Sequence, residues 1–205
     1  MTFVNEWHNY VPAEGWDHTS RQMEKALLPE TPLEYQLLRN TDFVRGLLWG
    51  LPRYGHPEGE VFKHIQEVLS NIDQLPIDKD RRSQLRTIAF AHDTFKYLED
   101  KNHPRDWTKH HGPIARRFME AFSSDPLILD IIELHDEAYY AWRLEFLLHK
   151  PEEGRFKMNS LWERLGNDKQ MYYLFFKCDT LTGDKNPAPL KWFEKTIEEI
   201  KIIHF

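Results

Sequence analysis

The chain of 205 residues contains a single cysteine, Cys178, and this scarcity limits both its redox chemistry and its metal chemistry. One cysteine excludes an internal disulfide and any zinc site built from several thiolates. A metal site in this chain must therefore use histidines and carboxylates, and the sequence has 11 histidines and 33 Asp and Glu residues to supply them.

Long apolar runs are also missing. No stretch approaches the roughly 20 apolar residues that a transmembrane helix requires. The first six residues, Met1 to Glu6, lack the basic and apolar pattern of a signal peptide. We therefore expect no membrane partner and a cytoplasmic location.

An excess of positive charge is absent as well, since the formal net charge is -6. Nonspecific binding to a nucleic-acid backbone depends on many phosphate contacts from Lys and Arg. A long nucleic acid is therefore an unfavourable partner. A small phosphorylated substrate is compatible with this charge.

Strand patterns are nearly absent, because no clearly alternating run is followed by a hairpin turn. Apolar residues instead recur at spacings of three and four, and this pattern predicts an all-α fold. Pro151 and Gly154 are expected to end one of the helices. The predicted helices cover about residues 17–28, 32–40, 42–49, 59–72, 79–99, 107–122, 126–135, 139–149, 160–165, 168–181 and 187–202.

The length fits one helical-bundle domain over residues 1–205. Residues 1–50 are expected to form an N-terminal arm, packed onto the body through residues 1–15, and the first helices. A metal-binding core follows over 56–183. The last segment, 187–205, is expected to form a C-terminal helix.

The dipeptide His92-Asp93 is the most informative feature, because it lies in the apolar run from Leu85 to Phe95. An imidazole and a carboxylate in a buried helix are costly unless something binds them, and a divalent cation would do so. Imidazole and carboxylate ligands suit Mn, Fe, Co, Ni or Zn, whereas an all-oxygen Mg or Ca site needs no histidines. We expect one or two divalent transition-metal ions.

His64 and Asp179 are the candidate partners of this dipeptide. His64 shares an apolar helix face with Val61 and Val68, and Asp179 follows an apolar and aromatic segment. A core histidine and a surface carboxylate are the alternative interpretations. Because the residues lie on three separate predicted helices, a bundle can direct them all inward onto one ion.

The order of His64, then His92-Asp93, then Asp179 resembles the H…HD…D signature of the HD-domain metal-dependent phosphohydrolase superfamily, over about residues 56–183. The resemblance implies an HD-type helical bundle and the hydrolysis of a phosphate ester.

The same resemblance implies ligands for a second metal at His111 and His135. Two-metal relatives have paired histidines where this chain reads His135-Asp136. Asp136 therefore either replaces a ligand or faces elsewhere. With two ions, Asp93 is the best bridging ligand because a carboxylate has two oxygens. With one ion, Asp93 would hold it and orient the attacking water, which is its expected catalytic role.

The chemistry of such a site is compatible with phosphoester hydrolysis. A bound cation lowers the pKa of a coordinated water, which can attack phosphorus as hydroxide. Lys96 lies four residues after His92 and is expected to offset charge on the phosphoryl group. Arg116 and Arg117, which follow His111, are further candidates for substrate binding.

A substrate pocket also needs walls. Tyr139, Trp142 and Arg143 recur at helical spacing after His135 and could stack a nucleobase, with core packing as the alternative. His56 lies in a loop rich in Gly and Pro before His64 and could line the entrance to the site, with a turn histidine as the alternative.

The sequence thus predicts a metal-dependent phosphohydrolase acting on a nucleotide or another small phosphate ester. One alternative is a phosphodiesterase or nuclease that cleaves a cyclic nucleotide or a short oligonucleotide. The other is a noncatalytic metal-containing module that binds a ligand.

Overall fold

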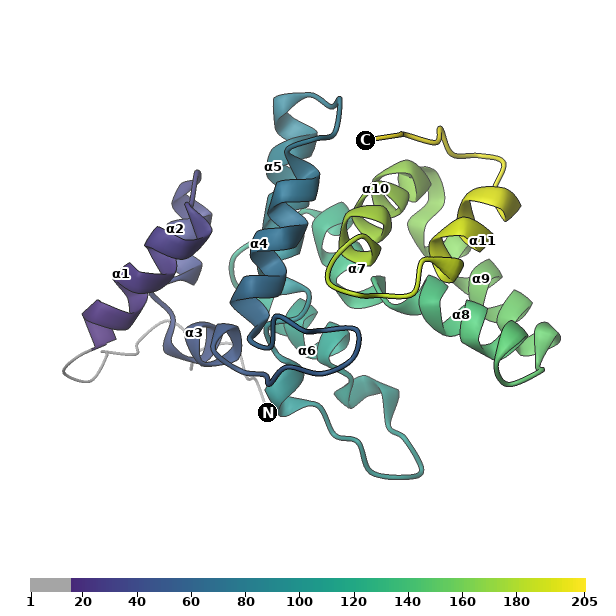
Figure 1. Ribbon diagram of the computed structural model, residues 1–205, viewed down its shortest axis with the longest axis horizontal. Coiled ribbons are helices and arrows are strands. Elements are labelled where there is room, and N and C mark those ends of the chain that lie inside the picture. The colour runs from purple at the N-terminus through teal and green to yellow at the C-terminus, as the bar shows by residue number, and fades with distance from the viewer. Residues whose placement is uncertain (1–15) are drawn as a thin grey trace.

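The computed structural model describes residues 16–205, which fold into helices joined by loops (Figure 1). Within this range there is no strand, and the sole β-bridge pairs Arg53 with His56. The all-α prediction is confirmed for these residues. The arm predicted over residues 1–15 lies outside the described residues.

The α-helices follow one another along most of the described chain. They are α1 (Trp16–Leu27), α2 (Pro32–Leu37), α3 (Thr41–Leu47), α4 (Val61–Ile72), α5 (Lys79–Ala91), α6 (His111–Met119), α7 (Pro126–Leu134), α8 (Glu137–Phe146), α9 (Pro151–Leu165), α10 (Lys169–Thr180) and α11 (Ala188–Thr196). Short 3-10 helices are η2 (Lys96–Leu98), η3 (Trp107–Lys109) and η4 (Gly166–Asp168). Among the described residues, no helix has both the length and the apolar character needed to cross a membrane.

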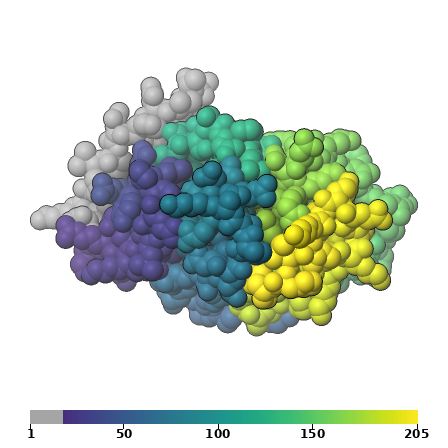
Figure 2. All heavy atoms as spheres, turned by 90° about the horizontal axis from the view of Figure 1, so that it is seen from above, coloured from purple at the N-terminus to yellow at the C-terminus, as the bar shows by residue number. Residues whose placement is uncertain are grey.

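The helices are arranged from one end of the molecule to the other roughly in chain order. Helices α1 to α3 lie at one end, α4 and α5 lie in the middle, and α8, α9 and α11 lie at the other end (Figure 1). The space-filling view from above shows the same order (Figure 2). Residues from both α4 and α10 can therefore meet in the centre, where these two helices pack together.

Aromatic side chains fill much of the core. Phe43, Phe95 and Phe118 are fully or almost fully buried, and the rings of Phe95 and Phe118 are 4.7 Å apart. Towards the C-terminal end, Phe175 is fully buried and its ring lies 5.1 Å from that of His92. The histidine therefore sits directly against the apolar core.

Helix α5 ends earlier than predicted, at Ala91 rather than near residue 99. The hydroxyl of Thr94 donates to the carbonyl of Phe90, which the amide of residue 94 would use in a continuing helix. The Thr94 amide instead donates to the Ala91 carbonyl. His92 and Asp93 therefore lie in a turn between α5 and η2, and not inside a long helix.

Helix α8 ends before Pro151, as expected, but α9 begins at Pro151 rather than near residue 160. Pro151 is the first residue of α9, a position where its missing N–H costs nothing. Gly154 lies inside α9, where an added Cβ would come within 2.9 Å of the Ala141 carbonyl oxygen. The glycine therefore allows α8 and α9 to pack closely.

The C-terminal helix is shorter than predicted. Helix α11 ends at Thr196 and Ile197 takes an extended conformation, so the chain leaves the helix before the expected end at residue 202.

Candidate metal centre

Four of the predicted ligands meet at one point of the bundle. His64 comes from α4, Asp179 from α10, and His92 and Asp93 from the turn after α5. The Nε2 atom of His64 lies 2.8 Å from Asp179 Oδ1 and 3.3 Å from His92 Nε2. The Oδ2 atom of Asp93 lies 3.6 Å from His64 Nε2 and 3.5 Å from His92 Nε2. We call these four residues the first ligand group.

A second ligand group lies next to the first and consists of Asp93, His111, His135 and Asp136. The Nε2 atoms of His111 and His135 are 3.1 Å apart, and Asp93 Oδ1 lies 3.3 Å and 3.5 Å from them respectively. Asp136 Oδ2 lies 3.4 Å from His111 Nε2 and 3.6 Å from His135 Nε2. Of the two alternatives for Asp136, the structure has its carboxylate facing this group.

Asp93 belongs to both groups through different oxygens. Its Oδ2 faces His64 and His92, whereas its Oδ1 faces His111 and His135. A carboxylate in this position can bind two ions at once, as the sequence predicted for Asp93.

The proton positions on two of the histidines follow from their outer hydrogen bonds. His92 Nδ1 lies 2.9 Å from the Ala89 carbonyl, and His135 Nδ1 lies 2.9 Å from the Ile132 carbonyl. Because a carbonyl only accepts hydrogen bonds, each Nδ1 carries the proton and donates. In each neutral ring the Nε2 atom is therefore unprotonated, and its lone pair can bind a metal.

The other two histidines, His64 and His111, also carry a proton on Nδ1. Thr182 Oγ1 donates to the Asp179 carbonyl at 2.7 Å, so it accepts from His64 Nδ1 at 3.3 Å. His111 Nδ1 donates to the Glu99 carboxylate at 3.3 Å. Such hydrogen bonds to Nδ1 are the usual outer contacts of metal-binding histidines.

These tautomers bring unprotonated nitrogens into close contact. Neutral His64 and His92 direct two Nε2 lone pairs at each other across 3.3 Å, and His111 and His135 do so across 3.1 Å. Two lone pairs at this distance repel unless a cation lies beside both. A metal about 2.1 Å from each donor would place neighbouring donors roughly 3.0 to 3.4 Å apart. The buried groups are therefore compatible with bound metal ions, as their arrangement within metal-binding distance indicates.

The carboxylates of the two groups are held in the anionic form that binds metals. Burial tends to raise the pKa of Asp93, but the neighbouring His92 imidazole and the Lys96 ammonium group hold it well below its usual value. Burial acts in the same way on Asp179, and the charge of Lys185 lowers its pKa strongly. For Asp136, His135 and His111 outweigh burial and lower the pKa to about 2.

The histidines differ in how readily they accept a proton. Burial, together with the charge of Lys185, lowers the pKa of His64 to about 4. Burial also opposes protonation of His135, but Asp136 and the hydrogen bond with Asp93 raise its pKa to about 9. The second group thus attracts positive charge strongly.

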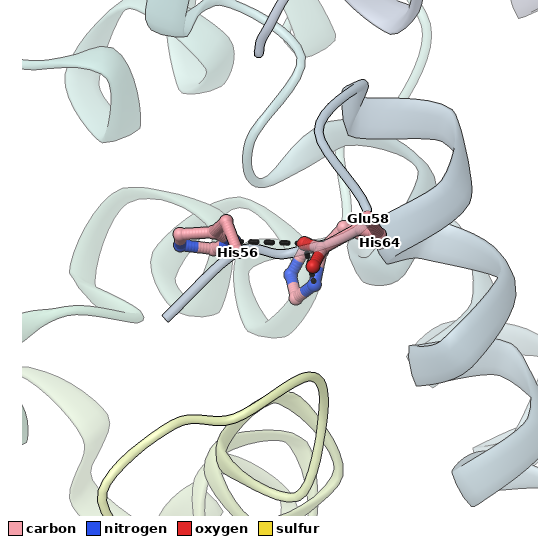
Figure 3. Close-up of side chains that lie close together, drawn as sticks. All are labelled: His56, Glu58 and His64. Carbon is pink, nitrogen blue, oxygen red and sulfur yellow. Dashed lines mark hydrogen bonds and ion pairs between the residues drawn. The ribbon is translucent and has the colours of Figure 1, made fainter. Parts of the chain in front are cut away.

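A carboxylate that the sequence analysis missed lies behind the first group. Glu58 Oε1 accepts from His56 Nδ1 at 2.9 Å and lies 3.6 Å from His64 Nδ1 (Figure 3). His56, Glu58 and His64 also lie close enough together to form a candidate ligand set of their own. Since His64 Nε2 already faces the first group, we assign Glu58 to orienting the ring of His64.

The second group has a corresponding outer carboxylate in Glu99, which the sequence analysis also missed. Glu99 contacts His111 Nδ1 and forms an ion pair with Arg105. His110 is nearby, but its Nδ1 accepts from the Gly112 amide and caps α6. His110 lies within metal-binding distance of Glu99 and His111, but in the neutral ring its Nε2 carries the proton and lies 3.1 Å from the Tyr140 hydroxyl, so we assign His110 to capping α6.

A cavity of about 250 Å³ opens beside both ligand groups. Three predicted substrate or catalytic residues, His56, Lys96 and Tyr139, line it together with Asp93. Lys185 also lines it, although the sequence analysis did not select this residue. Its position in the loop after α10 gave no helical pattern from which the contact could be inferred.

Other residues predicted to bind substrate lie elsewhere. Arg116 forms ion pairs with Asp130 at 2.5 Å and Glu133 at 3.1 Å, away from this cavity. Arg117 donates to the Thr108 carbonyl.

Of the residues predicted to form a wall that stacks a nucleobase, Tyr139, Trp142 and Arg143, Tyr139 alone lines the cavity. Trp142 is buried against Tyr139 and Phe146, in agreement with the alternative of core packing. Arg143 stacks on the outer part of the wall, with its guanidinium 5.7 Å from the Tyr139 ring centre. Neither Trp142 nor Arg143 lines the cavity.

Comparisons of the chain with family models, with curated proteins and with solved structures found no match. The arrangement of the side chains is therefore the basis for any statement about function.

Proposed function

We propose that the protein is a metal-dependent phosphohydrolase of the HD-domain type that acts on a nucleotide or another small phosphate ester. The observation that carries the proposal is Asp93, which turns one oxygen to each of two groups of histidine Nε2 atoms at the edge of a cavity. Many phosphatases use two metal ions about 3.5 to 4 Å apart, and a carboxylate that faces two ligand groups would suit such a pair.

His64, His92, Asp93 and Asp179 would hold one ion, and Asp93, His111, His135 and Asp136 would hold the other. When bound, the ions would lower the pKa of a water molecule and neutralise charge on the phosphoryl oxygens. The protein contributes fixed ligands, since the Nδ1 hydrogen bonds of His92 and His135 run to main-chain carbonyls that cannot rotate away.

Lys96 is the residue best placed to act on the substrate. Its Nζ atom lies 2.5 Å from Asp93 Oδ2, and its side chain lines the cavity. Burial tends to lower its pKa, but the charge of Asp93 raises it, so Lys96 remains an ammonium ion at neutral pH. A fixed ammonium group beside the phosphoryl group would stabilise the charge that develops there during transfer.

The size of the cavity supports a small substrate. At about 250 Å³ it lies just below the volumes of about 300 to 1,000 Å³ that are usual for sites of drug-sized ligands. A phosphate and part of its substituent would fill it. Tyr139, which is 38% exposed at the rim, offers an aromatic face for a nucleobase that extends outwards.

The experiment that tests this function is phosphate release from a panel of nucleotides and simple phosphate esters with added Mn, Co or Ni. The protein should release phosphate only with metal, and a chelator should abolish the release. If the metal-loaded protein hydrolyses no phosphoester but is stabilised by a nucleotide, the noncatalytic ligand-binding alternative would replace this proposal.

A further inference from the structure

A second lysine, Lys185, lines the same cavity as Lys96. Lys185 contacts Asp179, whereas Lys96 contacts Asp93. The Nζ atom of Lys185 lies 2.9 Å from Asp179 Oδ1 and 3.0 Å from the Asp179 carbonyl. The Nζ atom of Lys96 lies 2.5 Å from Asp93 Oδ2. The two lysine side chains are only 19% and 16% exposed, and both line the cavity. Two ammonium groups therefore border the space next to the ligand groups.

The loop that carries Lys185 is fixed by contacts on both sides. The Gly183 amide donates to Glu67 at 2.7 Å, and Asp184 Oδ1 accepts from the Gly55 amide at 2.6 Å. The Lys185 amide donates to the Thr182 carbonyl within the loop. A lysine held in this way loses less conformational freedom on binding a ligand than a free surface lysine does.

The site becomes positively charged when metals bind. Its inner side chains comprise three ligand carboxylates, on Asp93, Asp136 and Asp179, and the two lysines. Together with His135 they carry no net charge while His135 is protonated, and one net negative charge once that proton has left, as it does when a metal binds. Two divalent ions would turn this into three positive charges, and a hydroxide would leave two. The loaded site then matches an anion with two negative charges.

We infer that Lys96 and Lys185 together bind the terminal phosphate of a phosphomonoester, so that the protein prefers monoesters to diesters. This inference rests on the proposed phosphohydrolase function. A monoester phosphate is a dianion at neutral pH and has one substituent, whereas a diester is a monoanion with two. The charge of the site and the small cavity both favour the monoester.

Hydrolysis of a phosphomonoester also forms a product that the two lysines should bind. Water attacks phosphorus, the bond from phosphorus to the ester oxygen breaks, and that oxygen takes up a proton. The products are an alcohol and inorganic phosphate. Inorganic phosphate is a dianion in part at neutral pH, so it should bind to the same two lysines.

The test compares Lys185→Ala with the wild-type protein in two assays. Binding of inorganic phosphate to the manganese-loaded protein is measured by calorimetry, with metal content determined on the same samples. Hydrolysis is measured with p-nitrophenyl phosphate and with bis(p-nitrophenyl) phosphate. Lys185→Arg tests whether a cation at this position suffices, and Lys191→Ala removes an exposed lysine of α11 as the control.

In Lys185→Ala, phosphate should bind about 10- to 100-fold more weakly, the range expected for one lost hydrogen bond between charged groups. The ratio of monoester to diester kcat/KM should fall by a similar factor while metal content is unchanged. Lys185→Arg should recover part of both effects, and Lys191→Ala should match the wild type.

Unchanged phosphate binding and an unchanged ratio in Lys185→Ala would overturn the inference, as would a loss of metal that accounts for both effects. Failure of the proposed function has a different result. In that case the wild-type protein would hydrolyse neither ester, and binding of phosphate through Lys185 would still decide whether the two lysines form an anion site.

Discussion

His111 and His135 face each other with their Nε2 atoms 3.1 Å apart, while both Nδ1 atoms donate hydrogen bonds away from the contact. Neutral rings in this arrangement would bring two lone pairs together. A proton or a metal ion must therefore lie beside both nitrogens. The contact links the fold to the proposed chemistry, because His111 starts α6 and His135 directly follows α7.

In the metal-free protein, the pair should hold a proton that metal binding displaces. Despite burial, Asp136 and Asp93 raise the pKa of His135 to about 9, above its usual value of 6.5. His135 is thus protonated below about pH 9, and a metal binds only its neutral form. The affinity of the second group should rise about tenfold per pH unit up to about pH 9 and then level off.

Calorimetry in two buffers of different ionisation enthalpy measures this proton release. His64 of the first group is the internal control, because burial lowers its pKa to about 4 and a proton no longer competes for its Nε2 above about pH 5. An affinity of the second group that stays constant between about pH 6.5 and 8.5, with no proton released, would contradict the prediction.

Substitutions in the two ligand groups should each remove one ion. His64→Gln lacks an imidazole of the first group, and His111→Gln lacks one of the second, while Asp93 remains in both proteins. Each variant should bind about one ion per chain by elemental mass spectrometry. If either variant retains both ions, its histidine is not a ligand.

Glu58 should affect metal binding by the first ligand group alone, and Glu99 should affect metal binding by the second group alone. Glu58→Gln weakens the contact with His64 Nδ1, and Glu99→Gln weakens that with His111 Nδ1. Loss of such outer contacts typically lowers metal affinity about 10- to 100-fold. Titration with metal should show a weaker first site in Glu58→Gln and a weaker second site in Glu99→Gln. An equal effect of either variant on both sites would show that neither carboxylate orients a particular histidine.

Gly46 of α3 should be needed to position the turn that carries Asp93. A Cβ atom added at Gly46 would lie 1.8 Å from the Thr94 carbonyl oxygen, so the turn would have to move. Gly46→Ala should lower the free energy of unfolding by about 1 to 3 kcal/mol, as overpacking usually does, and should weaken metal binding.

The matched control is Arg45→Ala, which changes the neighbouring exposed residue of the same helix. Its effect on the free energy of unfolding should stay within about 0.5 kcal/mol. Thermal or urea unfolding of both variants measures the difference. A Gly46→Ala protein as stable as the control, with normal metal binding, would rule out this role for α3.

The candidate ligands could be selected from the sequence because their polarity conflicts with their surroundings. His92-Asp93 interrupts an apolar run, and Asp179 follows a segment that proves to be buried. Helical periodicity likewise predicted most of the helices. It did not predict the end of α5, because a hydrogen bond from the Thr94 side chain replaces a main-chain bond there.

The outer parts of the site depend on contacts between distant segments. Lys185 is positioned by its loop, in which the neighbouring Asp184 accepts a hydrogen bond from the Gly55 amide, 129 residues earlier in the chain. Glu58 and Glu99 lie in loops without a periodic pattern, and only the fold brings each to a histidine. Gly154 was misinterpreted for the same reason, since its role depends on the packing of α8 against α9.

The most direct test of the proposed two-metal centre is the number of ions per chain in the wild-type protein and in Asp93→Asn, measured by elemental mass spectrometry after loading with manganese. Asp80→Asn, at an exposed position of α5, is the control. We predict two ions in the wild type and the control. Asp93→Asn should lose at least one ion and all metal-dependent phosphate release. Wild-type protein that binds no ion, or an Asp93→Asn protein with two ions and full activity, would contradict the account.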